Sequence, residues 1–88
     1  MNHRAILEEL LELLAGRNIT IRTEALGGGG GGLCEMKDKK VFFYDSQAGA
    51  YESAVQAAKA VLYVIEDLEI IFIKPAVRDF LDRIKEMN

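Results

Sequence analysis

The chain has very few of the residues that build disulfides, metal centres and nucleophile–base pairs. Its 88 residues include one cysteine, Cys34, one histidine, His3, one proline and no tryptophan. One cysteine cannot form an intrachain disulfide, and one cysteine with one histidine cannot supply the four ligands of a structural zinc site. Such sparing use of cysteine is typical of a reducing compartment. We therefore expect a cytoplasmic protein with no bound metal and no cofactor.

Positive charge is also scarce. Eleven Lys and Arg residues stand against fourteen Asp and Glu residues, which gives a net charge of −3. That balance lacks the basic patch that binds nucleic acid, so we expect no nucleic-acid partner. The only local basic group, Lys37, Lys39 and Lys40, is interrupted by Asp38. It fits a solvated hairpin turn or a small anion-contact patch.

Long apolar runs are absent as well. No run approaches the roughly 18 residues that cross a bilayer, so we expect no membrane span. Acidic residues, Glu8, Glu9 and Glu12, interrupt the leucines near the N-terminus. We therefore also expect no signal peptide.

The rest of the composition is that of an ordinary folded domain. Half of the residues are hydrophobic and 28% are charged, which argues against disorder. The length fits one domain over residues 1–88. A chain this short buries only about 60–65% of the surface that it exposes when unfolded, so its stability as a monomer is limited.

Hydrophobic periodicity predicts three helices and four strands. Apolar residues recur at helical spacing in the helical segments, and they alternate with polar residues or form short continuous runs in the strands. Asn2 and Gly49 are predicted N-caps, and Pro75 is predicted at the first position of the last helix. The predicted helices cover residues 3–15, 50–67 and 75 onward, and the predicted strands cover 18–25, 33–37, 40–45 and 69–73.

The short connections between the first three strands predict an antiparallel meander. The helix over 50–67 is then a crossover, which places strand 69–73 parallel to strand 40–45. The predicted fold class is α+β: a mixed four-stranded sheet, made of an antiparallel meander plus one parallel strand, with three packed helices in the order α-β-β-β-α-β-α. Three amphipathic helices cover one face of such a sheet and leave apolar surface on the other. This uncovered surface, together with the apolar excess of helix 50–67, indicates a homodimer.

One edge of this predicted sheet gathers the residues with chemical potential. In the expected topology, four segments meet at one edge together with the N-termini of two helices. They are the six-glycine run, the start of strand 33–37 and the ends of strands 40–45 and 69–73. The glycine run fits a flexible hairpin loop, a ligand-covering loop or a phosphate cradle. The candidate ligand-binding residues at this edge are Gly28, Gly29, Gly30, Gly31, Cys34, Asp45 and Lys74.

Each side chain in this set also has a purely structural explanation. Cys34 fits a small core residue or a reactive thiol. Asp45 fits a turn-forming carboxylate or a catalytic one. Lys74 fits a solvated strand end. His3 is the only histidine and lies at the far N-terminus, so no nucleophile–base pair is evident in the sequence.

Three short motifs resemble a small uncharacterised bacterial family. They are the segment 30–34 (Gly-Gly-Gly-Leu-Cys), Lys40-Val41 with Asp45, and the segment 74–78 (Lys-Pro-Ala-Val-Arg), and together they span roughly residues 25–81. The resemblance implies a Gly-rich segment, a Leu-Cys pair, a hairpin, an Ala-rich helix and a last helix that begins at proline. It implies no assigned activity. This chain has Asp38 and Lys39 where the family has glycine, and its glycine run is longer.

The sequence thus favours a non-catalytic binding or interaction module that dimerises. The alternative is a small-ligand or anion-binding protein with a site at the glycine-rich sheet edge, either with or without Cys34. The ligand and the protein partner are not specified by any motif in the chain.

Overall fold

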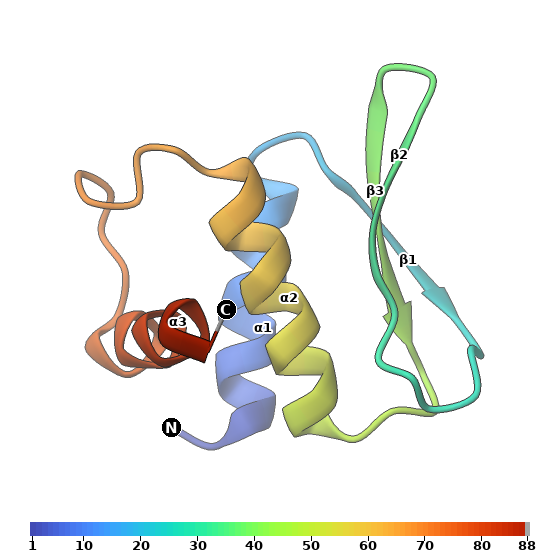
Figure 1. Ribbon diagram of the computed structural model, residues 1–88, viewed down its shortest axis with the longest axis horizontal. Coiled ribbons are helices and arrows are strands. Elements are labelled where there is room, and N and C mark those ends of the chain that lie inside the picture. Colours follow the sequence, from blue (N-terminus) through green and yellow to red (C-terminus); the bar gives the residue numbers. More distant parts are fainter. Residues whose placement is uncertain (88) are drawn as a thin grey trace.

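The computed structural model describes residues 1–87 and contains three helices and a three-stranded sheet, an α+β fold (Figure 1). All three helices lie on one side of the sheet, with α1 and α2 between the sheet and α3. The elements are α1 (His3–Ala15), β1 (Thr20–Glu24), β2 (Gly32–Met36), β3 (Lys39–Asp45), α2 (Ala50–Val64) and α3 (Pro75–Met87).

Local signals explain where the helices begin. The side chain of Asn2 caps α1 by accepting a hydrogen bond from the N–H of Ala5 at 2.8 Å, as its sequence position predicts. Gly49 caps α2 through its extended backbone alone, and Pro75 opens α3. α2 ends at Val64, three residues before the predicted end.

The core lies mainly between α2 and its neighbours. Large residues of α1 and β3, including Leu10, Leu14 and Phe42, are fully buried there. α2 contributes small residues at its contacts, such as Ala54 and Ala58, which allow the backbones of neighbouring helices to approach closely. The apolar stripe of α3 then packs against α1 and α2 rather than on the sheet.

The predicted antiparallel meander is wrong. β3 is the central strand: β1 pairs with it in parallel, from Thr20↔Val41 onward, and β2 pairs with it antiparallel. β3 carries the most apolar strand sequence, and both Val41 and Phe42, which point to opposite faces, are buried. A strand that buries both faces is favoured at the centre of the sheet, so it lies between the other two.

The predicted strand over 69–73 is also wrong, because this segment is an irregular connection between α2 and α3. The sheet therefore has three strands rather than four, and the order is α-β-β-β-α-α. α3 packs on the side of α1 and α2 that faces away from the sheet, so the chain leaving α2 turns away from β3 (Figure 1). Tertiary packing here overrides the strand preference of Ile70–Ile73.

We call residues 68–73 the apolar loop. The guanidinium of Arg78 in α3 holds it by donating hydrogen bonds to the carbonyl oxygens of Leu68, at 2.8 Å, and of Ile71, at 3.3 Å. Ile73 is buried against the helices, whereas Ile70 and Phe72 are each 83% exposed. The loop is thus anchored at its backbone and presents two large apolar side chains to solvent.

The Arg78→Met variant is expected to free the apolar loop without unfolding α3. Methionine keeps the aliphatic stem but donates to neither carbonyl, so the protein should lose about 1–2 kcal/mol and several degrees in Tm. Hydrogen exchange of the amides over 68–73 should accelerate. Arg83→Met is the matched control, because within residues 1–87 Arg83 pairs only with the exposed side chain of Asp79 on the same helix. Equal exchange rates in the two variants would show that Arg78 does not anchor the loop.

No helix within residues 1–87 has the length and hydropathy needed to cross a bilayer, as the sequence predicts.

Candidate functional site

The glycine-rich segment folds around the carboxylate of Asp45. We call residues 25–31, which join β1 to β2, the glycine loop. Asp45 Oδ1 accepts hydrogen bonds from the N–H groups of Leu26, at 3.0 Å, and Gln47, at 2.9 Å. Its Oδ2 accepts from the N–H groups of Gly28, at 2.8 Å, and Gly30, at 3.1 Å. Four backbone donors therefore converge on one side chain at the end of β3.

Glycine is required in this loop for conformational and steric reasons. Gly28, Gly30 and Gly31 have positive φ angles, which side-chain-bearing residues rarely adopt. A Cβ atom on Gly31 would lie 1.8 Å from the carbonyl oxygen of Phe43, which no side-chain rotation could relieve. The N–H groups at every second position, those of Leu26, Gly28 and Gly30, converge on one point, an arrangement that resembles an anion-binding nest.

The anion in this nest belongs to the chain itself. Asp45 has no solvent-exposed surface. Burial alone raises the pKa of its carboxyl, but the N–H groups of Gln47, Leu26, Gly30 and Gly28 together outweigh burial and hold the pKa below its ordinary value. Asp45 is therefore a charged carboxylate whose oxygens each accept two N–H bonds.

The structure brings together most of the residues predicted for the glycine edge. Gly28, Gly30 and Asp45 are bonded directly. Gly29 and Gly31 lie in the same loop without bonding to the carboxylate; Gly29 has open space around it. The edge forms although the meander is wrong, because β1, β2 and β3 run in the predicted directions and only their lateral order differs.

Two predicted site residues lie apart from this cluster. Cys34 is exposed on the outer face of the sheet, the face turned away from the helices, beside a shallow depression that includes Leu26 and Phe43. Lys74 lies beyond the helices, where its Nζ is 3.3 Å from Glu9 Oε2 of α1. The prediction placed Lys74 at the end of a fourth strand, and without that strand it does not reach the glycine loop.

The only cysteine and the only histidine do not meet. The ring of His3 lies 4.9 Å from that of Tyr51 and 6.0 Å from that of Phe80, in an aromatic cluster formed by the three helices. Cys34 lies on the face of the sheet opposite to Leu33 and Phe42, which pack against the helices. This geometry provides no imidazole base for the thiol.

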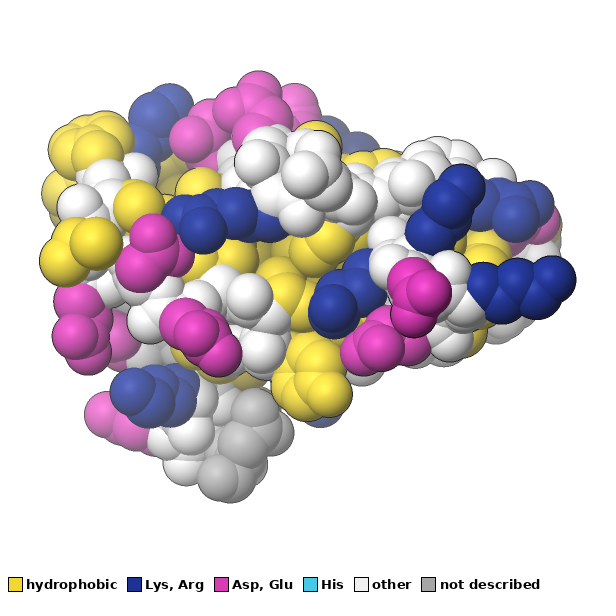
Figure 2. Space-filling model, turned by 90° about the horizontal axis from the view of Figure 1, so that it is seen from above, with side chains coloured by type: hydrophobic (Ala, Val, Ile, Leu, Met, Phe, Trp, Pro, Cys, Tyr) yellow, Lys and Arg dark blue, Asp and Glu magenta, His cyan; other side chains and the backbone are white. Residues whose placement is uncertain are grey.

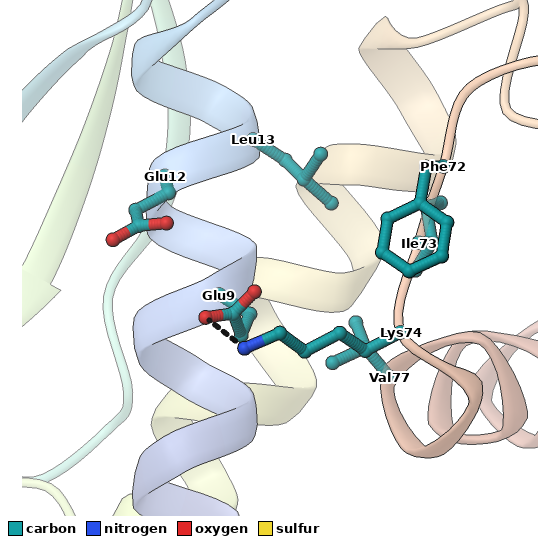
Figure 3. Close-up of a pocket in the computed structure, with 7 residues that line it drawn as sticks. All are labelled: Glu9, Glu12, Leu13, Phe72, Ile73, Lys74 and Val77. Carbon is teal, nitrogen blue, oxygen red and sulfur yellow. Dashed lines mark hydrogen bonds and ion pairs between the residues drawn. The ribbon is translucent and has the colours of Figure 1, made fainter.

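A second feature was not predicted from the sequence. A groove of about 360 Å³ separates α1 from the chain that leads into α3 (Figure 3). Leu13, Ile73 and Val77 supply its apolar lining, and the ring of Phe72 stands at its rim. The ion pair between Glu9 and Lys74 supplies its polar wall, and Glu12 borders it with its carboxylate turned away from Lys74.

The apolar loop separates this groove from a second, larger one of about 730 Å³, lined by residues of α2, the loop and α3 that include Leu62, Glu69 and Leu81. Hydrophobic side chains gather at the apolar-loop end of the molecule, whereas lysines and arginines gather at the opposite end, over the β2–β3 hairpin (Figure 2). One sequence signal could have identified this surface. It is a strand-like run, Glu69–Ile73, that has no strand to pair with.

Comparisons of the chain with known protein families, with curated proteins and with solved structures find no match. Residues 1–87 also contain no group of three or more His, Cys, Asp and Glu side chains arranged to hold a metal ion. The resemblance to a small bacterial family remains a prediction.

Proposed function

We propose that the protein is a non-catalytic interaction module that binds protein chains, copies of itself included. The observation that carries the proposal is the exposure of Ile70 and Phe72, each 83% accessible on a loop that is anchored at its backbone. Exposed clusters of large apolar side chains mark protein-interaction surfaces more often than isolated ones do. The grooves on either side of the apolar loop offer concave surface next to these projecting side chains.

The alternative, an anion or small-ligand site at the glycine loop, has less support. The N–H groups that could bind an external anion already donate to Asp45. A phosphate would have to displace the buried carboxylate of Asp45. The carboxylate is part of the chain, so its binding costs no translational entropy, whereas binding of a free phosphate does. Cys34 is exposed beside the loop, but the histidine of the chain, His3, lies in the aromatic cluster among the helices.

The proposal is tested by placing a photo-crosslinking amino acid, p-benzoylphenylalanine, at position 70 or 72 in cells that express the protein. Covalent adducts with other chains should form at both positions. Positions 63 and 87 are the matched controls, because Tyr63 and Met87 are 71% and 70% exposed but lie outside the apolar loop. Absence of adducts, or identical adducts at all four positions, would contradict a docking role for the loop.

A stability measurement separates docking from folding. The double variant Ile70→Ser and Phe72→Ser should melt within about 2 °C of the native chain, because exposed side chains contribute little to the folded state. A fall of more than about 8 °C would show instead that these residues stabilise their own fold, and the proposal would then lose its main support.

A further inference from the structure

We propose that two copies of this chain pair along the outer edges of their β2 strands, antiparallel and about a twofold axis, to form one continuous six-stranded sheet. The proposal deepens the proposed function and rests on it, since it specifies how an interaction module of this kind dimerises.

The turn determines which backbone groups of β2 point outward. Lys37 and Asp38 both have positive φ angles, 47° and 67°, as in a two-residue type I′ turn. The residues that flank such a turn, Met36 and Lys39, form a hydrogen-bonded pair, and the pairs then alternate along the ladder. Met36, Cys34 and Gly32 therefore bond to β3, whereas the N–H and C=O groups of the two intervening residues point away from the sheet.

Those outward residues, Leu33 and Glu35, have free backbone groups. Within residues 1–87 neither N–H donates to another residue. β2 contains no proline and pairs with β3 without a bulge. Its one charged residue, Glu35, shares the helix-facing side of the sheet with Leu33 but is exposed. Because its outward backbone groups are unpaired, this edge is a template for strand addition.

The other edge of the sheet is less suited to self-pairing. The middle residue of β1 is Arg22, so a twofold axis through the middle of β1 would place two guanidinium groups opposite each other. In the structure Arg22 is already engaged, with its Cζ 5.6 Å from the ring centroid of Phe43 and its Nη2 3.0 Å from Glu24 Oε2.

Only one register of two β2 strands uses all the outward groups. A twofold axis beside Cys34 pairs Leu33 of each copy with Glu35 of the other. Each of these two pairs exchanges two backbone hydrogen bonds, which gives four in total. An axis at Glu35 would oppose two carboxylates. An axis at Leu33 would pair Glu35 with Gly31 of the second copy, and Gly31, with φ 73°, is not extended.

This register places the two Cys34 residues directly opposite each other. They form a non-hydrogen-bonded pair with Cα atoms about 4.5 Å apart, inside the range of about 4.4–6.8 Å that a disulfide spans. Both thiols lie on the outer face of the sheet, where Cys34 is exposed. The single native cysteine thus reports the proposed register directly.

The first experiment compares crosslinking at two positions. The reduced protein at about 100 μM is treated briefly with diamide, which takes up the two electrons and two protons that a pair of thiols releases on forming a disulfide. The native chain should form a covalent dimer at least about tenfold faster than the variant Cys34→Ala with Met36→Cys. Met36 is the matched control, because it is exposed on the same face of β2 but pairs with Gly32 of the second copy. Equal rates, or a faster reaction at position 36, would overturn the register.

The second experiment removes one outward donor. Proline at position 35 lacks the N–H that points away from β3, so Glu35→Pro leaves the hairpin pairing intact and should weaken the dimer at least about tenfold by sedimentation at equilibrium. Glu35→Ala keeps the N–H and should still dimerise. Monomeric native protein at 100 μM would overturn the edge pairing while leaving the apolar-loop crosslinks as a separate test of the proposed function. A dimer insensitive to Glu35→Pro would overturn the edge pairing and leave dimerisation itself in place.

Discussion

The Gly31→Ala variant should lose at least about 3 kcal/mol of folding free energy and more than about 10 °C in Tm. The added Cβ would meet the carbonyl oxygen of Phe43 at 1.8 Å, and the φ of Gly31, 73°, is strained for any L side chain. The neighbour is backbone of the central strand, so relief requires β3 or the glycine loop to move. Thermal unfolding followed by circular dichroism measures the loss.

Gly29→Ala is the matched control two residues earlier in the same run. The Cβ position of Gly29 has no atom within 4 Å, and its φ is not positive. Alanine there should leave Tm within about 2 °C or raise it slightly, because it reduces the conformational entropy of the unfolded chain. If both variants melted at the same temperature, the described path of the glycine loop past Phe43 would be wrong.

Replacement of Asp45 by asparagine should destabilise the loop and lower Tm by about 10 °C or more. Asparagine offers one acceptor oxygen, and its NH2 group would face two N–H donors. Whichever way the asparagine amide is turned, two backbone N–H groups lose their acceptor. They are either those of Leu26 and Gln47 or those of Gly28 and Gly30. Asp79→Asn, on the exposed face of α3, is the matched control and should change Tm by less than about 2 °C.

The same carboxylate predicts a pH dependence with a definite sign. The pKa of Asp45 in the folded state lies below its ordinary value of about 3.9, so the unfolded chain binds more protons between the two values. The stabilisation is fully present above about pH 4 and is lost as the pH falls through the folded-state pKa. The urea concentration at the midpoint of unfolding, measured between pH 2 and 6, should fall toward low pH in the native chain. The fall should be smaller in Asp45→Asn. Parallel curves for the two proteins would contradict the charge assigned to Asp45.

The sequence was informative wherever the deciding interaction is local. Asn2 caps α1, Pro75 opens α3 and the hydrophobic stripes locate all three helices, because caps and periodicity depend on residues within one or two turns. Strand directions were also correct, and they brought the glycine run and Asp45 to one edge. The glycine pattern indicates that a nest can form, but not that the chain itself supplies the anion.

Lateral strand order and the apolar loop escaped prediction because they depend on contacts distant in sequence. Period-two alternation shows which face of a strand is buried, but it is silent on which strand lies beside it. The run Glu69–Ile73 has the composition of a buried strand. It forms a loop because α3 covers the helices rather than the sheet, a choice made by packing across the whole domain.

The bonds of the glycine loop to Asp45 also make the sheet mechanically asymmetric. At that end the exit of β1, the entry of β2 and the exit of β3 are fastened to one buried carboxylate. At the other end the β2–β3 hairpin extends past the helices, and no hydrogen bond or ion pair of Lys37 or Asp38 to another element is present within residues 1–87 (Figure 1). We therefore expect amide hydrogen exchange in β3 to be fastest beside the turn at Lys37 and Asp38 and slowest toward Asp45.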